Sequence, residues 1–215
     1  MTGTSPGGVP LRHLPMFPLS TVLFPHARIP LHVFEPRYRA MMADCLAGDS
    51  RFGIVLIARG PEVGGGDERM AVGTRAVIGE AASLPDGRWV ILARGEARIT
   101  VGEWLADAPY PRARVQEWPS PTEPVDPSLV HEVTRCVRRT RGLLAEFGQS
   151  PTLSAGTSFA TDHDVACWQL CAEAPLNAFD AQRVLAVPGT MDRLALLLSL
   201  TMAVKKDVLR LLEMG

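Results

Sequence analysis

The chain has 215 residues, of which 47% are apolar and 21% are charged, and its formal net charge is −1. This length and apolar content are enough to bury a core in one or two domains. A net charge close to zero excludes a global attraction to nucleic acid or to an anionic membrane. The four cysteines form no CxxC pair, which favours reduced thiols in a cytoplasmic protein.

The N-terminus and the longest apolar run argue against export and membrane insertion. Residues 1–10 are rich in Gly, Pro, Thr and Ser, so we expect a flexible tail there and no secretory signal. Residues 194–204 are apolar, but a membrane-spanning helix needs about 20 residues. We therefore expect a cytoplasmic protein that has no membrane partner.

Residues 11–118 show the pattern of short strands and predict a β-rich subdomain. Residues 52–58 form an apolar run rich in branched side chains, and residues 89–92 follow the hairpin dipeptide Asp86-Gly87. Further strands are expected over residues 71–81, 97–104 and 112–118. Many short strands separated by Gly and Pro predict a barrel or a curled sheet.

One helix is expected to interrupt these strands, beginning at Pro36. Glu35 stands at the N-cap position, and Pro36 suits the first helical position because the N–H that it lacks would have no partner there. We expect Gly48 to end this helix in a left-handed conformation. The apolar face of the helix then carries Tyr38, Met41, Met42 and Cys45.

A proline-rich segment predicts a boundary between two subdomains. Residues 119–127 contain four prolines, which stiffen the backbone into an extended linker. A helical subdomain is expected over residues 128–215, with a loop over residues 148–161 and helices over residues 129–147, 164–173, 178–186 and 191–213. The expected fold class is therefore α+β. Apolar residues outside the main stripe of the last helix leave pairing with a second copy open.

Several motifs occur in a fixed order along the chain. They are LPMFPLSTVLFP (residues 14–25), IPLHVFEPRYR (29–39), FGIVLI (52–57), VGTRAVI (72–78), LPDGR (84–88), PYPRARV (109–115), DAQRVL (180–185) and DRLAL (192–196). Together they resemble the LON domain, the N-terminal substrate-selecting segment of the ATP-dependent Lon protease. The resemblance implies a PUA-like β-domain in a stand-alone protein that binds unfolded protein or peptide, with a separate ATP-dependent protease as a further partner.

The catalytic parts of a Lon protease are not found in the sequence. No GxxxxGK[ST] loop is present to bind phosphates, and the only two lysines lie side by side without a serine motif. No GxSxG nucleophile elbow is present either. We expect a non-catalytic binding module without a cofactor, and a hydrolase similar to Lon stays open as an alternative.

Two groups of potential metal ligands occur in the sequence, and neither predicts a metal site. His131-Glu132 begins like a zinc-protease helix, but Arg135 replaces the second histidine. His163, Cys167 and Cys171 share one helical face, yet a zinc ion would need a fourth donor, and cysteines beside apolar residues commonly pack in a core.

The sharpest local motif is EPRYR at the start of the first helix. Its arginines and tyrosine would suit a groove that holds peptide, and nearby methionines would suit adaptable apolar recognition. The expected binding residues are Glu35, Arg37, Tyr38, Arg39, Met41 and Met42. The alternative is architectural, with Glu35 capping the helix and the arginines tying the helix to the barrel.

A basic cluster on the first helix of the helical subdomain raises a last alternative. It consists of Arg135, Arg138, Arg139 and Arg141. A PUA-like barrel could serve as a receptor for RNA or a small molecule, but the strands show no aromatic and basic residues interleaved for base stacking. Nucleic acid is therefore disfavoured as a partner.

Overall fold

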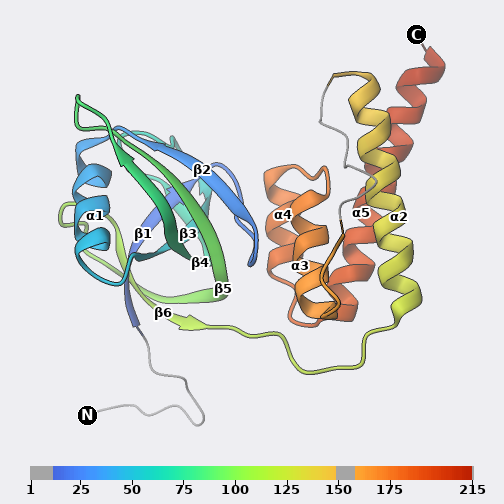
Figure 1. The fold of residues 1–215 in the computed structure, drawn as a ribbon, viewed down its shortest axis with the longest axis horizontal. Helices are drawn as coiled ribbons and strands as arrows, with labels where there is room; N and C mark the ends of the chain where they lie inside the picture. Colours follow the sequence, from blue (N-terminus) through green and yellow to red (C-terminus); the bar gives the residue numbers. More distant parts are fainter. Residues whose placement is uncertain (1–11, 149–157, 215) are drawn as a thin grey trace. The chain divides into compact units, whose positions relative to one another are not determined.

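The computed structural model describes residues 12–148 and 158–214. The chain divides into two units, Met1–Pro119 and Ser120–Gly215, of which the first is β-rich and the second helical (Figure 1). The α+β fold class predicted from the sequence is confirmed. The tail over residues 1–10 and most of the predicted loop over residues 148–161 lie outside the described residues, and the limits of the linker over residues 119–127 stay a prediction.

The first unit is built around a closed set of strands. The sheet contains β1 (Arg12–Leu19), β2 (Arg28–Val33), β3 (Arg51–Arg59), β4 (Glu68–Ser83), β5 (Trp89–Leu105) and β6 (Arg112–Glu117). Their order is β2-β5-β4-β3-β1-β6, and β5 also pairs with β6, so β5, β4, β3, β1 and β6 form a barrel. β2 lies beside the barrel and pairs with the first half of β5. The β1–β3 pair is parallel and the other pairs are antiparallel.

The predicted strands lie where strands are observed, but their predicted lengths differ from the observed lengths. The segments over residues 89–92 and 97–104 belong to one long strand, β5, because a register shift against β4 bends the strand without ending it. No separate strand was predicted where β1 and β2 lie. These strands contain Pro15, Pro18 and Pro30, and prolines are rare inside sheets because they lack an N–H for the ladder.

Buried side chains form two clusters in the β-rich unit. Neighbouring residues of a strand point to opposite faces, so Met16 and Phe17 belong to different clusters, as do Ile54 and Val55. The larger cluster packs α1 (Pro36–Ala47) against the strands (Figure 1). The helix contributes the four predicted residues, Tyr38, Met41, Met42 and Cys45.

The end of α1 differs from the prediction. Gly48 has φ −106° and ψ −130°, which is not left-handed. Its N–H donates to the carbonyls of Asp44 and Cys45, both at 3.1 Å, and the left-handed residue is Ser50 with φ 59°. Those hydrogen bonds close the helix without a left-handed Gly48. The left-handed turn follows two residues later than predicted, at Ser50.

The second unit contains four helices close to the predicted ones. They are α2 (Pro127–Glu146), α3 (His163–Glu173), α4 (Ala178–Leu185) and α5 (Thr190–Met214). Side chains of Asp126, Asp162 and Asn177 accept backbone N–H groups at the starts of α2, α3 and α4, which satisfies donors that a helix start leaves unpaired. Among the described residues, none of the helices has the length and apolar character needed to cross a membrane.

Candidate functional site

The carboxylate of Glu35 anchors a loop. Glu35 occupies the N-cap position of α1, but its side chain makes no capping hydrogen bond. Instead, Oε2 accepts from Arg37 Nε at 3.1 Å and from the backbone N–H of Gly64 at 3.3 Å. The expected capping role is therefore wrong, and the carboxylate holds the β3–β4 loop against the start of α1.

The two arginines of the motif also contact the barrel. The Arg37 guanidinium carbon lies 4.4 Å from the centroid of the Tyr38 ring on the same helix, and a Cβ atom on Gly65 of the β3–β4 loop would lie 3.1 Å from Arg37 Nη1. The Arg39 guanidinium lies over Gly87 in the β4–β5 hairpin, where a Cβ atom would collide with it. These contacts fit the architectural alternative, in which the arginines tie α1 to the β3–β4 loop and to the hairpin.

The other three expected binding residues belong to the core. Tyr38 is 2% exposed, and Met41 and Met42 are fully buried. Burial raises the pKa of Tyr38 to about 12, so its phenol stays neutral. A bound peptide would therefore reach Glu35, Arg37 and Arg39 at most, and those side chains already hold parts of the barrel.

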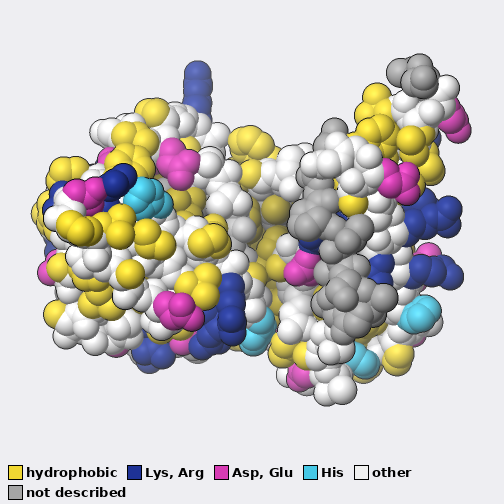
Figure 2. All heavy atoms as spheres, turned by 45° about the horizontal axis from the view of Figure 1, so that its top comes forward, with side chains coloured by type: hydrophobic (Ala, Val, Ile, Leu, Met, Phe, Trp, Pro, Cys, Tyr) yellow, Lys and Arg dark blue, Asp and Glu magenta, His cyan; other side chains and the backbone are white. Residues whose placement is uncertain are grey.

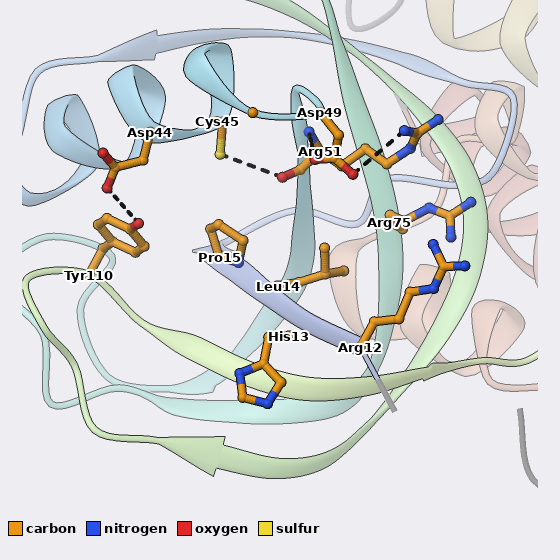
Figure 3. Close-up of a pocket in the computed structure, with 11 residues that line it drawn as sticks. Arg12, His13, Leu14, Pro15, Asp44, Cys45, Asp49, Arg51, Arg75 and Tyr110 are labelled. Atoms are coloured by element: carbon orange, nitrogen blue, oxygen red, sulfur yellow. Dashed lines mark hydrogen bonds and ion pairs between the residues drawn. The ribbon is translucent and has the colours of Figure 1, made fainter. Parts of the chain in front are cut away.

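A polar pocket of about 310 Å³ opens on the β-rich unit, near the end of α1 (Figure 3). Arg51 and Arg75 lie on its wall, and both donate to Glu96, with Nε to Oε2 distances of 2.7 and 3.2 Å. Arg75 also pairs with Glu117. Because carboxylates already balance these two guanidinium groups, neither is free to bind an anion in the pocket.

The ionisable hydroxyl and thiol of this pocket are held neutral. The hydroxyl of Tyr110 donates to Asp44 Oδ2 at 2.7 Å, and the Cys45 thiol donates to the Arg51 carbonyl at 3.5 Å (Figure 3). Burial raises the pKa of Cys45 to about 12. A thiol is a nucleophile only as the thiolate, so Cys45 is not suited to covalent chemistry at neutral pH.

An apolar surface lies on the outer face of β2, β5 and β4. Residues paired across neighbouring strands form rows that run across the sheet. One row consists of His32, Val90 and Ala82. The next row contains Pro30, Leu92 and the exposed Glu80, whose carboxylate borders the apolar side chains. The exposed Phe34 follows β2 and lies edge-on to His32, with ring centroids 6.4 Å apart. We call this surface, made of Pro30, His32, Phe34, Ala82, Val90 and Leu92, the β2–β5–β4 face.

This face is exposed because the opposite side of the same strands packs into the core. Ile91 and Ala93 of β5 are buried and alternate with the outward Val90 and Leu92. Phe34 is 50% exposed and Val90 is 44% exposed. Figure 2 shows apolar side chains gathered on the surface of the β-rich unit. This surface was not predicted from the sequence. Without a strand over residues 28–33, the alternating exposure of the β2 side chains had no partner strand to align with.

In the helical unit, the histidine and cysteines of α3 do not assemble a metal site. Cys167 and Cys171 are buried, and Arg193 Nη1 lies 3.9 Å from the Cys167 sulfur. A hydrogen bond from Cys171 and the Arg193 charge lower the pKa of Cys167. Within residues 12–148 and 158–214, no three His, Cys, Asp or Glu side chains are placed to hold a metal ion.

The basic cluster of α2 does not form one continuous patch. Arg141 forms an ion pair with Glu173 of α3, and Arg138 lies over the ring of Phe159 at 5.9 Å. Arg135 and Arg139 are exposed. Two of the four arginines therefore pack within the helical unit, which leaves a smaller charged surface than the sequence suggested.

Comparison with known proteins supports the resemblance read from the motifs. The Lon protease of Trichlorobacter lovleyi is 27% identical over 188 residues, which cover 84% of this chain and 22% of that protein. A LON peptidase N-terminal domain and RING finger protein of Schizosaccharomyces pombe is 29% identical over 116 residues, 48% of this chain and 24% of that protein. The chain thus spans about a fifth of the length of the Lon protease that it matches.

Solved structures and a family model agree with this relationship. The Lon N-terminal domain protein from Xanthomonas campestris superposes with a TM-score of 0.64 at 26% identity, covering 87% of this chain and 98% of that one. The N-terminal domain of the Mycobacterium avium complex Lon protease gives 0.59 at 16% identity, covering 89% of this chain and 98% of that one, which supports the fold alone. The family model of the ATP-dependent protease La (LON) substrate-binding domain matches residues 13–202. The chain therefore belongs to the LON substrate-binding domain family.

Proposed function

We propose that this protein is a non-catalytic cytoplasmic module that binds unfolded polypeptide through the β2–β5–β4 face and presents it to a separate ATP-dependent protease. The observation that carries the proposal is the exposure of Phe34 and Val90 on one outer sheet face of a substrate-binding-domain fold. Exposed apolar residues that cluster on one face commonly mark an interaction site.

The chemistry of this face suits weak and unselective recognition. Side chains of Val90, Leu92 and Pro30 are apolar, and burial of apolar surface is a non-directional interaction that depends mainly on area. Unfolded chains share exposed apolar side chains and little else. A shallow apolar face can therefore bind many of them without reading a sequence.

The free edge of β2 offers only limited backbone pairing. The Gly95 N–H donates to the Ala27 carbonyl, and hydrogen-bonded pairs alternate along an antiparallel ladder, so the backbone groups of Arg28, Pro30 and His32 point away from β5. Pro30 has no N–H to offer. An added strand would lose a central hydrogen bond, so apolar contacts with the face supply most of the affinity.

The EPRYR motif supports this surface from behind. Arg39 packs on Gly87, between the two strands that carry Ala82 and Val90. We infer that the motif keeps the hairpin in place, and that its role in binding is indirect. The neutral thiol of Cys45 and the absence of motor and protease motifs support a role without catalysis.

The test is fluorescence anisotropy of a labelled, permanently unfolded polypeptide titrated with the protein. We expect saturable binding, no binding to a folded control, and an intact polypeptide on a gel. Val90→Asp should weaken binding about tenfold or more, because it places a charge in the apolar contact. Val63→Asp is the matched control, since Val63 is 54% exposed but lies in the β3–β4 loop.

Two results would overturn the proposal. Equal affinities of the Val90 and Val63 variants would move binding away from the β2–β5–β4 face. Cleavage of the polypeptide that disappears on mutation of a single residue would restore the hydrolase alternative. Circular dichroism of both variants verifies that the loss does not come from unfolding.

A further inference from the structure

The outward face of α5 carries a second surface, separate from the β2–β5–β4 face. Met202, Lys206, Leu209 and Glu213 follow one another at helical spacing along its centre, with Lys205 and Arg210 on the flanks, and they line an open surface site of about 660 Å³ formed by α5 alone. We call these six residues the α5 stripe. The spacing of three or four residues keeps the stripe on one side of the helix over its whole length.

The α5 stripe lies away from the packed side of the same helix. Leu194, Leu197 and Val208 are buried against the rest of the helical unit, whereas Met202 is 54% exposed. The Lys206 stem can cover apolar surface while its ammonium stays in water. The stripe therefore carries the apolar Met202 and Leu209 among charged side chains and has no covering element in the described part of the chain.

The charge of the stripe indicates what would bind there. Lys205 and Lys206 are the only lysines in the chain, and within residues 12–148 and 158–214 neither forms an ion pair. Arg210 pairs with Asp207 at 3.6 Å, where both side chains are largely exposed, so this pair is screened and weak. The stripe thus keeps cations available on both sides of Met202 and Leu209.

We propose that the α5 stripe docks an amphipathic helix of a partner protein, one whose apolar seam is bordered by Asp and Glu. Residues 199–213 extend over about 21 Å of helix, at about 1.5 Å per residue. A straight, open helix face of this length suits a second helix laid along it, with apolar anchors at helical spacing. Carboxylates on the borders of that helix would pair with Lys205 on one flank and Arg210 on the other.

The same charges argue against other occupants. In a symmetric pair of two copies, Lys205, Lys206 and Arg210 of each stripe would face their counterparts with Glu213 as the one carboxylate of the stripe to balance them, and like charges across an interface are costly. An anionic membrane attracts clusters of about four to eight basic residues, whereas this segment offers Lys205, Lys206 and Arg210 against Asp207 and Glu213. An acidic helix is the occupant that complements the stripe.

The test uses two labelled synthetic helices of about 20 residues with the same leucine seam, one bordered by Glu and the other by Lys. We expect the acidic helix to bind the full chain at least about tenfold tighter than the basic one. The double variant K205E/K206E should reverse this preference. The matched control is R135E/R139E, which makes the same charge change on the exposed side of α2 and should leave the preference unchanged.

A second readout does not depend on variants. Because Lys205 and Lys206 are the only lysines, reductive methylation followed by mass spectrometry reports on the stripe directly, and the bound acidic helix should protect both amines. The proposal is overturned if K205E/K206E binds the acidic helix like the wild type, or if neither helix binds. It is equally overturned if light scattering shows a dimer that Met202→Glu dissociates, or if phosphatidylserine vesicles bind the stripe.

Discussion

The guanidinium carbon of Arg193 lies 3.6 Å from the centroid of the Trp168 ring, and Arg193 is fully buried in the helical unit. Its Nη2 group donates to the carbonyls of Val187 and Pro188, both at 3.1 Å. One buried cation therefore joins α3, the start of α5 and the turn between α4 and α5.

Removing this side chain tests whether it organises the helical unit. Arg193→Ala leaves a cavity beside Trp168 and takes the donor away from two carbonyls, so we expect the free energy of unfolding to fall by about 3 kcal/mol. Urea denaturation followed by far-UV circular dichroism measures it. Arg183→Ala on α4, where the side chain is 60% exposed, should change stability by less than about 0.5 kcal/mol. Equal effects of the two substitutions would contradict the central role of Arg193.

The second prediction concerns Glu35. Glu35→Ala should lower stability by about 1 kcal/mol because it releases the β3–β4 loop from Arg37 and from the Gly64 N–H. Hydrogen exchange separates this cause from a capping effect. Faster exchange confined to residues 60–67 is expected, whereas faster exchange in the first turn of α1 would show that the carboxylate caps the helix after all.

The third prediction is a late titration of both tyrosines. Burial raises the pKa of Tyr38 from its ordinary value of 10.0 to about 12. Burial and the hydrogen bond to Asp44 raise the pKa of Tyr110 to about 12 as well. The unfolded chain loses these protons at lower pH than the folded chain, so the stability that they contribute is complete below pH 10 and is lost as pH rises from 10 to about 12.

Ultraviolet absorbance of phenolate measures this directly, since the chain contains two tyrosines. Folded protein should show little phenolate until the pH approaches 12, and protein in urea should titrate near 10. A folded-state step near pH 10 would mean that at least one of the two phenols is freely solvated.

The fold could be predicted well from the sequence because its main signals are local. The face of α1 with Tyr38, Met41 and Met42 follows from spacing alone, and the helices of the second unit follow from their apolar periodicity. β1 and β2 were harder to predict. Their prolines weaken the local signal, and both strands are stabilised by partners distant in sequence, Gly53 for Met16 and Leu92 for Pro30.

The candidate site was less predictable for a related reason. EPRYR stands out as a motif, but a motif does not reveal whether its side chains point to solvent or to the barrel, and Glu35, Arg37 and Arg39 are used internally. No single motif contains the β2–β5–β4 face, because Pro30, His32 and Phe34 fall in IPLHVFEPRYR whereas Ala82, Val90 and Leu92 fall in no motif. The face can be recognised only once the pairing of β2 with β5 is known, because that pairing brings His32 beside Val90.

The last prediction compares two glycines in adjacent strands. A Cβ atom on Gly73 of β4 would collide with the backbone carbonyl of Ile54, whereas one on Gly53 of β3 would collide mainly with the flexible end of the Met16 side chain. Backbone in a closed barrel cannot retreat without breaking its ladder, but a methionine can change rotamer. We expect Gly73→Ala to cost about 3 kcal/mol and Gly53→Ala about 1 kcal/mol. Thermal and urea denaturation of the two variants measure the difference, and a larger loss for Gly53→Ala would show that Met16 is held more rigidly than the strand backbone.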